Sequence, residues 1–319
     1  MKYRRLGKSG LEVSVIGIGT YQFGGEWGKD FTQREVDAIL NAGEECGINL
    51  IDTAECYGDH LAEQLVGGCI RHNRSRWIVA TKFGHRFHGF QHRSRQWRPE
   101  EVRRQIEESL RVLHTDYIDI LQYHSPTNDE ALTSGLKELL ELEVQAGKIR
   151  HIGISLSQSL CKSSDTFQVQ KAPELDAAVM QIMYNRLERT AEREILPLCR
   201  QLDLGVITRV PLASGLLSGK YGTGSRFPDN DVRAHRDRSE LMDMLREVER
   251  IQFEELPEGM FLSIWALSWC LKHPAVSCVI PGCKSAQQVL QNARTADLLE
   301  EPHPQDIPYS SDYHDQDPL

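Results

Sequence analysis

The chain has no excess of positive charge, no paired-cysteine motif and no long apolar run. Its 319 residues include 37 Lys and Arg against 46 Asp and Glu, a formal net charge of −9. An acidic chain lacks the electrostatic footprint of a nucleic-acid-binding protein and has no general attraction to anionic membranes. We therefore expect neither nucleic acid nor a membrane among its partners.

The eight cysteines are scattered, and none forms a Cys-x-x-Cys pair of the kind that zinc ribbons and thioredoxin-type sites use. The longest apolar run, residues 261–271, is about half of a membrane span. No apolar segment follows the opening Met-Lys-Tyr-Arg-Arg, as a signal peptide would require. These absences favour a cytoplasmic protein with reduced thiols.

Apolar residues make up 40% of the chain, which is enough for a sizeable core. Eight short segments rich in β-branched residues recur along its length. They are nearly continuously apolar, as strands of a parallel sheet buried on both faces are. The segments are 15–19, 49–53, 77–82, 117–124, 149–155, 178–185, 205–210 and 276–281.

Helical patterns lie between these segments, such as the capping box at residues 32–35 and the helix start at Pro99. Eight strands alternating with helices indicate a doubly wound sheet or a (β/α)8 barrel, and the strand count and length favour the barrel. Residues 6–11 predict a β-hairpin that closes the bottom of the barrel. The stretch 211–277 is too long for one crossover and predicts a large loop region between the seventh strand and the helix that follows it.

No linker-like stretch interrupts residues 1–298, which we expect to form one domain. Residues 299–319 form a different kind of segment, a Pro-containing tail. From residue 300 onward this tail has six acids, four prolines and no Lys or Arg. That composition predicts an extended or partly disordered tail.

Ionisable residues interrupt the apolar segments at their carboxyl ends, which is where the active site of a (β/α)8 barrel lies. Lys82 and His124 end the third and fourth segments, Asp52 is next to last in the second, and Tyr57 follows the second. A lysine at the end of a buried strand needs a carboxylate partner, so we expect Lys82 to pair with Asp52. The Lys82 charge would then lower the pKa of Tyr57 and make it a usable general acid.

With these residues in place, the sequence resembles the aldo-keto reductase superfamily over nearly its whole length. Each matching piece falls at an expected strand end and in the expected order. The pieces are 17–20, 52–58, 80–82, 121–124, 153–155, 184–185 and 280–282. The resemblance implies NAD(P)H-dependent reduction of a small-molecule carbonyl substrate, with hydride supplied by nicotinamide C4. It implies that Tyr57 is the proton donor, that Lys82 and Asp52 tune it, and that His124 orients the carbonyl.

The sequence offers no Rossmann alternative. Gln22 stands where a G-x-G-x-x-G motif starting at Gly17 needs its third glycine, and no Tyr-x-x-x-Lys pair occurs. The resemblance instead implies that Ser155 and Gln181 bind the carboxamide of the nicotinamide, with Asn185 a weaker candidate. Leu156 stands where the family usually has Asn. Arg209 stands where an aromatic side chain often stacks on the nicotinamide, and its guanidinium would stack there or contact the pyrophosphate.

Two further segments match the cofactor site of the family. Residues 212–220 resemble the loop that covers the pyrophosphate. Lys284 and Ser285 would hold a 2′-phosphate, which favours NADPH over NADH, and Gln288 and Asn292 would meet the adenine. Alternatively, residues 212–220 form an ordinary surface loop, and Lys284 is a solvated helix-cap residue. The full set of expected cofactor residues is Gly19, Thr20, Ser155, Gln181, Arg209, Pro211, Leu212, Gly215, Leu216, Ser218, Lys220, Gly282, Lys284, Ser285, Gln288 and Asn292.

The stretch 84–98 is basic, with four arginines, three histidines and no acid. It either steers an anionic or polyhydroxylated substrate toward Tyr57 or is a solvated loop. His88 and His92 lack a third ligand nearby, so we expect no metal site. Residues expected to line the substrate pocket are Trp27, Arg86 and Phe87, with loop packing as the alternative.

Two other functions remain open on the same fold. One is a sugar 1-dehydrogenase that runs oxidatively with NAD. The other is an NADPH-binding regulatory β-subunit of a channel. Such subunits often carry a long N-terminal inactivation segment, whereas this chain starts directly in its expected hairpin. The pattern does not distinguish between oligomeric states.

Overall fold

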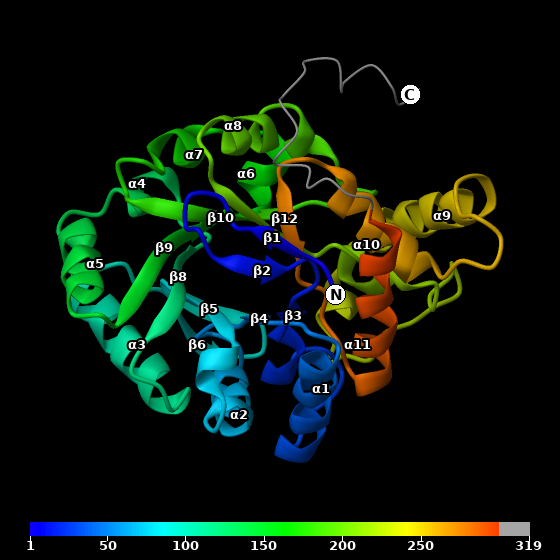
Figure 1. The fold of residues 1–319 in the computed structure, drawn as a ribbon. Helices are drawn as coiled ribbons and strands as arrows, with labels where there is room; N and C mark the ends of the chain where they lie inside the picture. Colours follow the sequence, from blue (N-terminus) through cyan, green and yellow to red (C-terminus); the bar gives the residue numbers. More distant parts are fainter. Residues whose placement is uncertain (300–319) are drawn as a thin grey trace.

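The computed structural model describes residues 1–299, and among them eight parallel strands form a barrel (Figure 1). Bridges from Ile16 to Val279 and from Gly19 to Gly282 join the two edge strands and close the barrel. The expected acidic tail lies outside the described residues, apart from Leu299. In barrel order the strands are β3 (Ile18–Gly19), β4 (Leu50–Asp52), β5 (Ile78–Phe83), β8 (Ile118–His124), β9 (Ile149–Ser155), β10 (Ala177–Met183), β11 (Gly205–Arg209) and β12 (Val276–Val279).

These strands confirm the eight predicted segments and the (β/α)8 fold, and helices cover the barrel. The Thr32 side chain accepts from the Glu35 backbone in the predicted capping box, and Pro99 opens α3. The helices are α1 (Gln33–Glu45), α2 (Leu61–Ile70), α3 (Pro99–Val112), α4 (Asn128–Ala131), α5 (Leu136–Gln145), α6 (Gln158–Ser163), α7 (Phe167–Lys171), α8 (Ile195–Gln201), α9 (Arg238–Glu254), α10 (Leu262–Lys272) and α11 (Ala286–Ala293).

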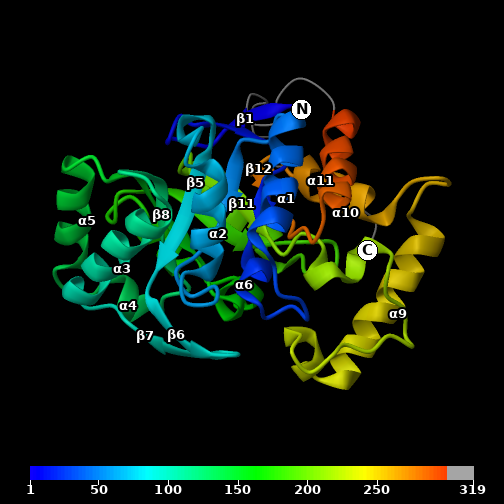
Figure 2. The ribbon, with the colours of Figure 1, turned by 90° about the horizontal axis from the view of Figure 1, so that it is seen from below.

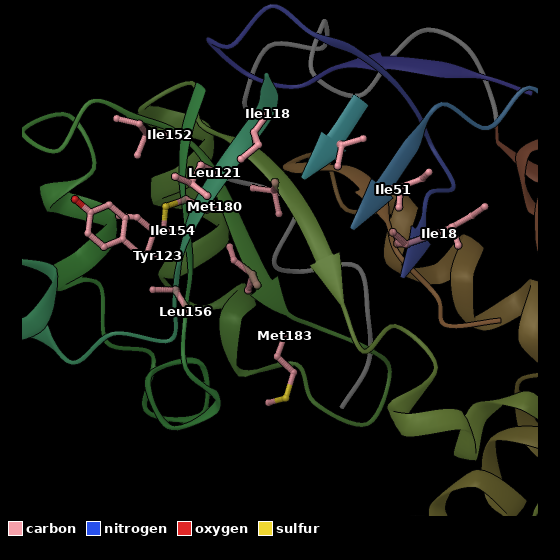
Figure 3. Close-up of a cluster of buried hydrophobic side chains, with 14 of the residues drawn as sticks. Ile18, Ile51, Ile118, Leu121, Tyr123, Ile152, Ile154, Leu156, Met180 and Met183 are labelled. Carbon is pink, nitrogen blue, oxygen red and sulfur yellow. The ribbon is translucent and has the colours of Figure 1, made fainter. Parts of the chain in front are cut away.

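Alternation along the strands divides the buried side chains into two clusters. Successive strand residues point to opposite faces, so Val79 and Leu121 pack toward the helices while Ala80 and Ile120 fill the barrel. Figure 3 shows part of the outer cluster, with Leu121 and Met180 among its labelled side chains. Both faces of the strands are therefore buried, which explains their continuous apolar sequence.

The N-terminal hairpin closes one end of the barrel. It consists of β1 (Tyr3–Arg5) and β2 (Glu12–Ser14), joined by the predicted turn. Leu6 and Val13 are buried in the inner cluster. A Cβ atom on Gly205 would lie only 2.5 Å from Leu6 Cγ, so the hairpin fits tightly against β11. Figure 2 shows β1 at this end and β6 and β7 at the other.

The opposite end carries two features that follow strands. Directly after β5, the basic stretch forms a second hairpin, β6 (His85–Gly89) with β7 (His92–Arg95), where the sequence indicated only a loop. After β11, the predicted long connection contains the 3-10 turns η4 (Ala213–Ser218) and η5 (Val232–His235), then α9 and α10. In Figure 2, α9 stands out beside the barrel. None of the helices within residues 1–299 is long and apolar enough to cross a membrane.

Candidate active site

A cavity of about 670 Å³ opens at the carboxyl ends of the strands. Each of the eight strands contributes to it, through its last residues or through the loop that follows. Asp52, Tyr57 and His124 line this cavity, and Lys82 lies buried behind them. The structure therefore brings together all four residues that the sequence predicts as catalytic.

The Lys82 ammonium group meets three acceptors. Its Nζ donates to Asp52 Oδ1 at 2.7 Å, to the Thr53 carbonyl at 2.7 Å and to Tyr57 Oη at 3.1 Å. An ammonium group has three protons to donate and accepts none, so these contacts satisfy Lys82 although it is only 1% exposed. Because Tyr57 Oη accepts from Lys82, the phenol keeps its own proton for another acceptor.

A hydrogen-bond network fixes the second oxygen of Asp52. Gln181 Nε2 donates to Asp52 Oδ2 at 2.6 Å, and Gln122 Nε2 donates to the same oxygen at 3.2 Å. Ser155 Oγ donates in turn to Gln181 Oε1 at 3.1 Å. The predicted carboxamide residues Ser155 and Gln181 are thus in contact, and both also belong to the network that holds Asp52.

The pKa of Tyr57 is raised well above the usual tyrosine value, first by burial and then by the Asp52 charge. The sequence-based expectation of a lowered pKa is therefore wrong for this structure, because the effect of burial on the phenolate exceeds that of nearby cations. Tyr57 is consequently protonated at neutral pH. A protonated phenol is the form that a proton donor needs.

His124 lies against Tyr57, with the two ring centroids 6.0 Å apart. Burial lowers the pKa of His124 well below its usual value, and the charges of Lys82 and Arg209 lower it further. The imidazole is therefore neutral at physiological pH. Its Nδ1 lies 3.6 Å from Cys56 Sγ.

Cationic side chains gather in another part of the cavity. Lys220, Arg233, Arg236 and Lys284 all line it. Asp231 pairs with Arg233 at 2.6 Å and offsets one of these charges. Lys284 Nζ donates to the Trp27 carbonyl at 2.5 Å. Four cations against one carboxylate suit a ligand with several negative charges.

Most of the predicted cofactor residues surround this cavity. Leu216 is buried in an apolar cluster beneath the loop, and Ser285 caps α11 by accepting from the Gln288 backbone, so neither lines the cavity. The residues that do line it are Gly19, Thr20, Ser155, Gln181, Arg209, Pro211, Leu212, Gly215, Ser218, Lys220, Gly282, Lys284, Gln288 and Asn292.

Three unusual positions have clear structural roles. The Asn185 side chain accepts from the backbone of Leu187 and Glu188 and stabilises a turn outside the cavity. Leu156 stands where the family usually has Asn. Its side chain is fully buried in the outer core, so it does not make the polar contact that an Asn side chain would make. Arg209 donates to the Leu156 carbonyl at 3.0 Å, while its Nε is buried without a partner.

The predicted substrate residues separate into two groups. Trp27 lines the cavity, but Arg86 and Phe87 lie on β6 away from the cavity wall. The basic stretch is also not a free positive island. Its other three arginines each pair with a glutamate: Arg93 with Glu26, Arg95 with Glu130 and Arg98 with Glu101.

Several cavity residues were missed from sequence alone. Tyr21 follows β3 and stacks on Tyr57, with ring centroids 4.7 Å apart. Its position directly after the first strand was an available signal. Arg233 and Arg236 come from the long connection after β11, where no periodic pattern marks a residue as facing the cavity.

Comparisons with known proteins agree with this architecture. Residues 15–303 match the model of the aldo/keto reductase family. A protein from Oryza sativa subsp. japonica described as a probable voltage-gated potassium channel subunit beta is 30% identical, over 94% of this chain and 92% of its own length. Aldo-keto reductase YhdN from Bacillus subtilis (strain 168) is 31% identical, over 91% of this chain and 87% of its own.

Solved structures show the same likeness. The holo form of aldo-keto reductase AKR11C1 from Bacillus halodurans superimposes with a TM-score of 0.76 at 30% identity, covering 93% of this chain and 91% of that one. The likeness thus covers the barrel, its loops and the strand ends that carry Asp52, Tyr57, Lys82 and His124. The chain belongs to the aldo/keto reductase family of oxidoreductases.

Proposed function

We propose that this protein is an NADPH-dependent carbonyl reductase in which Tyr57 donates a proton to the carbonyl oxygen. The observation that carries the proposal is the hydrogen bonding of Lys82. Its three protons go to Asp52, Thr53 and Tyr57, which leaves the Tyr57 proton free for a substrate oxygen in the cavity. After transfer, the same ammonium group stabilises the phenolate that remains.

The cavity fits a nicotinamide dinucleotide phosphate. The side chains of Lys220, Arg233, Arg236 and Lys284 match the phosphates. The unpartnered Nε of Arg209 offers a further buried donor. When bound, the nicotinamide supplies the hydride. Ser155 and Gln181 would hold its carboxamide, residues of the loop 212–220 its pyrophosphate, and Lys284 the 2′-phosphate that distinguishes NADPH from NADH.

His124 and the aromatic residues near Tyr57 would position the carbonyl. His124 is neutral, so it donates one hydrogen bond to the substrate oxygen without competing with Tyr57 for the proton. Tyr21 and Trp27 lie edge to face, with ring centroids 5.5 Å apart, and form an aromatic wall beside Tyr57. The buried Nε1 of Trp27 has no partner and provides another donor for a substrate oxygen.

A second candidate is a regulatory channel subunit that binds the same cofactor. The similarity to a described potassium channel subunit beta over 94% of this chain favours it. The complete set of Asp52, Tyr57, Lys82 and His124 favours the reductase, because a purely regulatory role does not require a proton donor.

The test is NADPH oxidation with a panel of aldehydes and ketones, comparing the wild type with Tyr57→Phe. Loss of one positioned proton donor should lower kcat by about 10²–10⁴-fold while NADPH binding is retained. Phe253→Tyr, on the exposed surface of α9, is a control that should leave the rate unchanged. Equal rates for the wild type and Tyr57→Phe would refute the assignment of Tyr57.

A further inference from the structure

The wall of the cavity beside Tyr57 holds a second group of chemically active side chains. Glu55 and Cys56 follow β4, His85 follows β5, and His124 ends β8. These three strands are neighbours in the barrel, so their carboxyl ends bring the four side chains together. Each offers one ligand atom, and the four atoms all lie within 4.8 Å of one another.

The distances within this group are close to those of a tetrahedral metal centre. His124 Nδ1 lies 3.6 Å from Cys56 Sγ and 3.8 Å from Glu55 Oε2. With bonds of about 2.0–2.3 Å, tetrahedral Zn²⁺ keeps its ligand atoms about 3.3–3.8 Å apart. The other pairs lie within 4.8 Å, so binding an ion draws these side chains together by at most about 1–1.5 Å.

The hydrogen bonding of Glu55 points independently to a missing ligand. Its side chain is only 2% exposed, and Oε1 accepts from the His85 backbone at 3.0 Å. Oε2 is buried without a hydrogen-bond partner, and so is Nδ1 of His85. Buried polar atoms normally have partners, so two unpartnered atoms in one group mark a site that something else completes.

We propose that Glu55, Cys56, His85 and His124 bind a single Zn²⁺-like divalent cation beside Tyr57. Two imidazoles, one thiolate and one carboxylate are a borderline-soft set, which suits zinc and disfavours magnesium and calcium. Binding replaces the thiol proton of Cys56, and the carboxyl proton of Glu55 if it is present, and these protons leave to solvent. The Cys56 thiol is not in a disulfide, as the structure records all eight cysteines as free.

Access and charge are compatible with such an ion. Cys56, His85 and His124 line the cavity, so a hydrated cation reaches them from solvent. Lys82, Arg209, Arg93 and Arg95 place positive charge near His124 and oppose a cation, although Arg93 is paired with Glu26 and Arg95 with Glu130. The thiolate and carboxylate together carry two negative charges that neutralise the divalent ion itself.

This site departs from the expectation of no metal drawn from the sequence. Residues 55, 56, 85 and 124 have no ligand-type spacing in the chain, and only the barrel brings them together. His88 and His92, the pair that the sequence singled out, lie apart from this group, and His88 bonds to Ser94.

The experiment uses the full-length protein, stripped of metal with a chelator and titrated with Co²⁺ as a spectroscopic probe. We expect one equivalent to bind, with thiolate-to-cobalt charge-transfer absorption and the ligand-field bands of tetrahedral cobalt. Zn²⁺ should displace the cobalt, whereas Mg²⁺ should not. Absence of these bands in the wild type would overturn the proposal.

Variants assign the ligands. Cys56→Ser should abolish the charge-transfer band, and His85→Asn should weaken Co²⁺ binding by at least about tenfold. Matched controls outside the group, Cys46→Ser and His88→Asn, should bind as the wild type does. A charge-transfer band that persists in Cys56→Ser, or is lost in Cys46→Ser, would contradict the proposal. Circular dichroism of each variant checks its fold.

This proposal does not rest on the reductase activity. Tyr57→Phe should lose carbonyl reduction yet still bind Co²⁺ with the wild-type spectrum, because Tyr57 is not a ligand. Failure of the proposed function and failure of the metal site would therefore be seen in separate measurements.

Discussion

At the scale of single residues, the site is organised around one buried ammonium group. Lys82 is tolerated in the barrel because Asp52 pairs with it, and Asp52 is held by Gln122 and Gln181. A buried charge without its partner is strongly destabilising, so these residues act as a unit. Tyr57 receives a hydrogen bond from this unit and keeps its own proton.

Lys284→Ala tests the residue proposed to recognise the 2′-phosphate. Loss of one charge-assisted hydrogen bond of about 1.5–3 kcal/mol should raise the Kd for NADPH by about 10–150-fold. The Kd for NADH should change little, because NADH lacks this phosphate. Fluorescence titration with both cofactors measures the difference, and Lys272→Ala, at the exposed end of α10, is the matched control. An unchanged Kd for NADPH would remove Lys284 from the cofactor site.

The residues that we propose as catalytic were predictable because barrel geometry assigns polar strand ends to one rim. Asp52, Lys82 and His124 interrupt apolar runs, which makes them visible in the sequence. The raised pKa of Tyr57 was not predictable, since it depends on how deeply the surrounding loops bury the phenol. Arg233 was missed because a long connection has no period that indicates which side chains face the cavity.

At the scale of elements, two loops meet over the cavity. Trp27, after β3, forms a bridge with Asp231 in the connection after β11, and Val232 N donates to the Glu26 carbonyl. Arg233 pairs with Asp231, and its guanidinium carbon lies 5.3 Å from the Trp27 ring centroid. This one ion pair therefore stabilises the contact between both loops.

Asp231→Asn should loosen this contact, because it leaves the buried Arg233 charge without its carboxylate. Breaking a buried pair costs about 3–5 kcal/mol, and local opening exposes the chain near Arg226 to trypsin. We expect cleavage after Arg226 to be at least about tenfold faster than in the wild type, measured by mass spectrometry. Asp229→Asn, at a neighbouring exposed position, should be cleaved at the wild-type rate.

The pH dependence of this contact has a defined sign. Although burial acts to raise the pKa of Asp231, its hydrogen bonds with Arg233 outweigh burial and hold this pKa below the usual aspartate value. The stabilisation is thus fully present above the unfolded-state pKa and is lost as pH falls through the lower folded-state pKa. Protection of residues 226–236 from hydrogen–deuterium exchange, corrected for the intrinsic exchange rate at each pH, should be the same at pH 7 and pH 5 and should decline only below about pH 4. A decline already between pH 7 and pH 5 would contradict this account.

The β6–β7 hairpin shows why some elements escape prediction from sequence. Its strands are rich in His and Arg, and Arg86 and His88 are exposed, so no apolar face marks them as strands. The hairpin is instead anchored by ion pairs to Glu26, in the loop after β3, and to Glu130, in α4. Long-range pairs of this kind leave no local pattern.

At the scale of the whole molecule, the two ends of the barrel have different roles: the first closes the core and the second forms the proposed active site. The β1–β2 hairpin fills the first, with Leu6 and Val13 packed among the inner strand residues. The second is left open for the cavity. The eight strands were predictable because burial on both faces makes each of them an apolar run, and this pattern is independent of the loops.

Leu6→Ala should therefore destabilise the protein although it is far from the cavity. Leu6 is fully buried, and truncating a buried leucine costs about 2–5 kcal/mol. Leu142→Ala, on an exposed site of α5, should change the free energy of unfolding by less than about 0.5 kcal/mol. Urea denaturation measures both, and similar values for the two variants would show that the hairpin does not close the barrel core.

The central claim is that this barrel transfers hydride to a carbonyl while Tyr57 supplies the proton. The most direct measurement follows deuterium from NADPH labelled at nicotinamide C4 into the alcohol product, using mass spectrometry. We expect the wild type to place one deuterium on the former carbonyl carbon and Tyr57→Phe to form little product. NADPH oxidation without deuterium in the product, or labelled product formed equally well by Tyr57→Phe, would contradict the account.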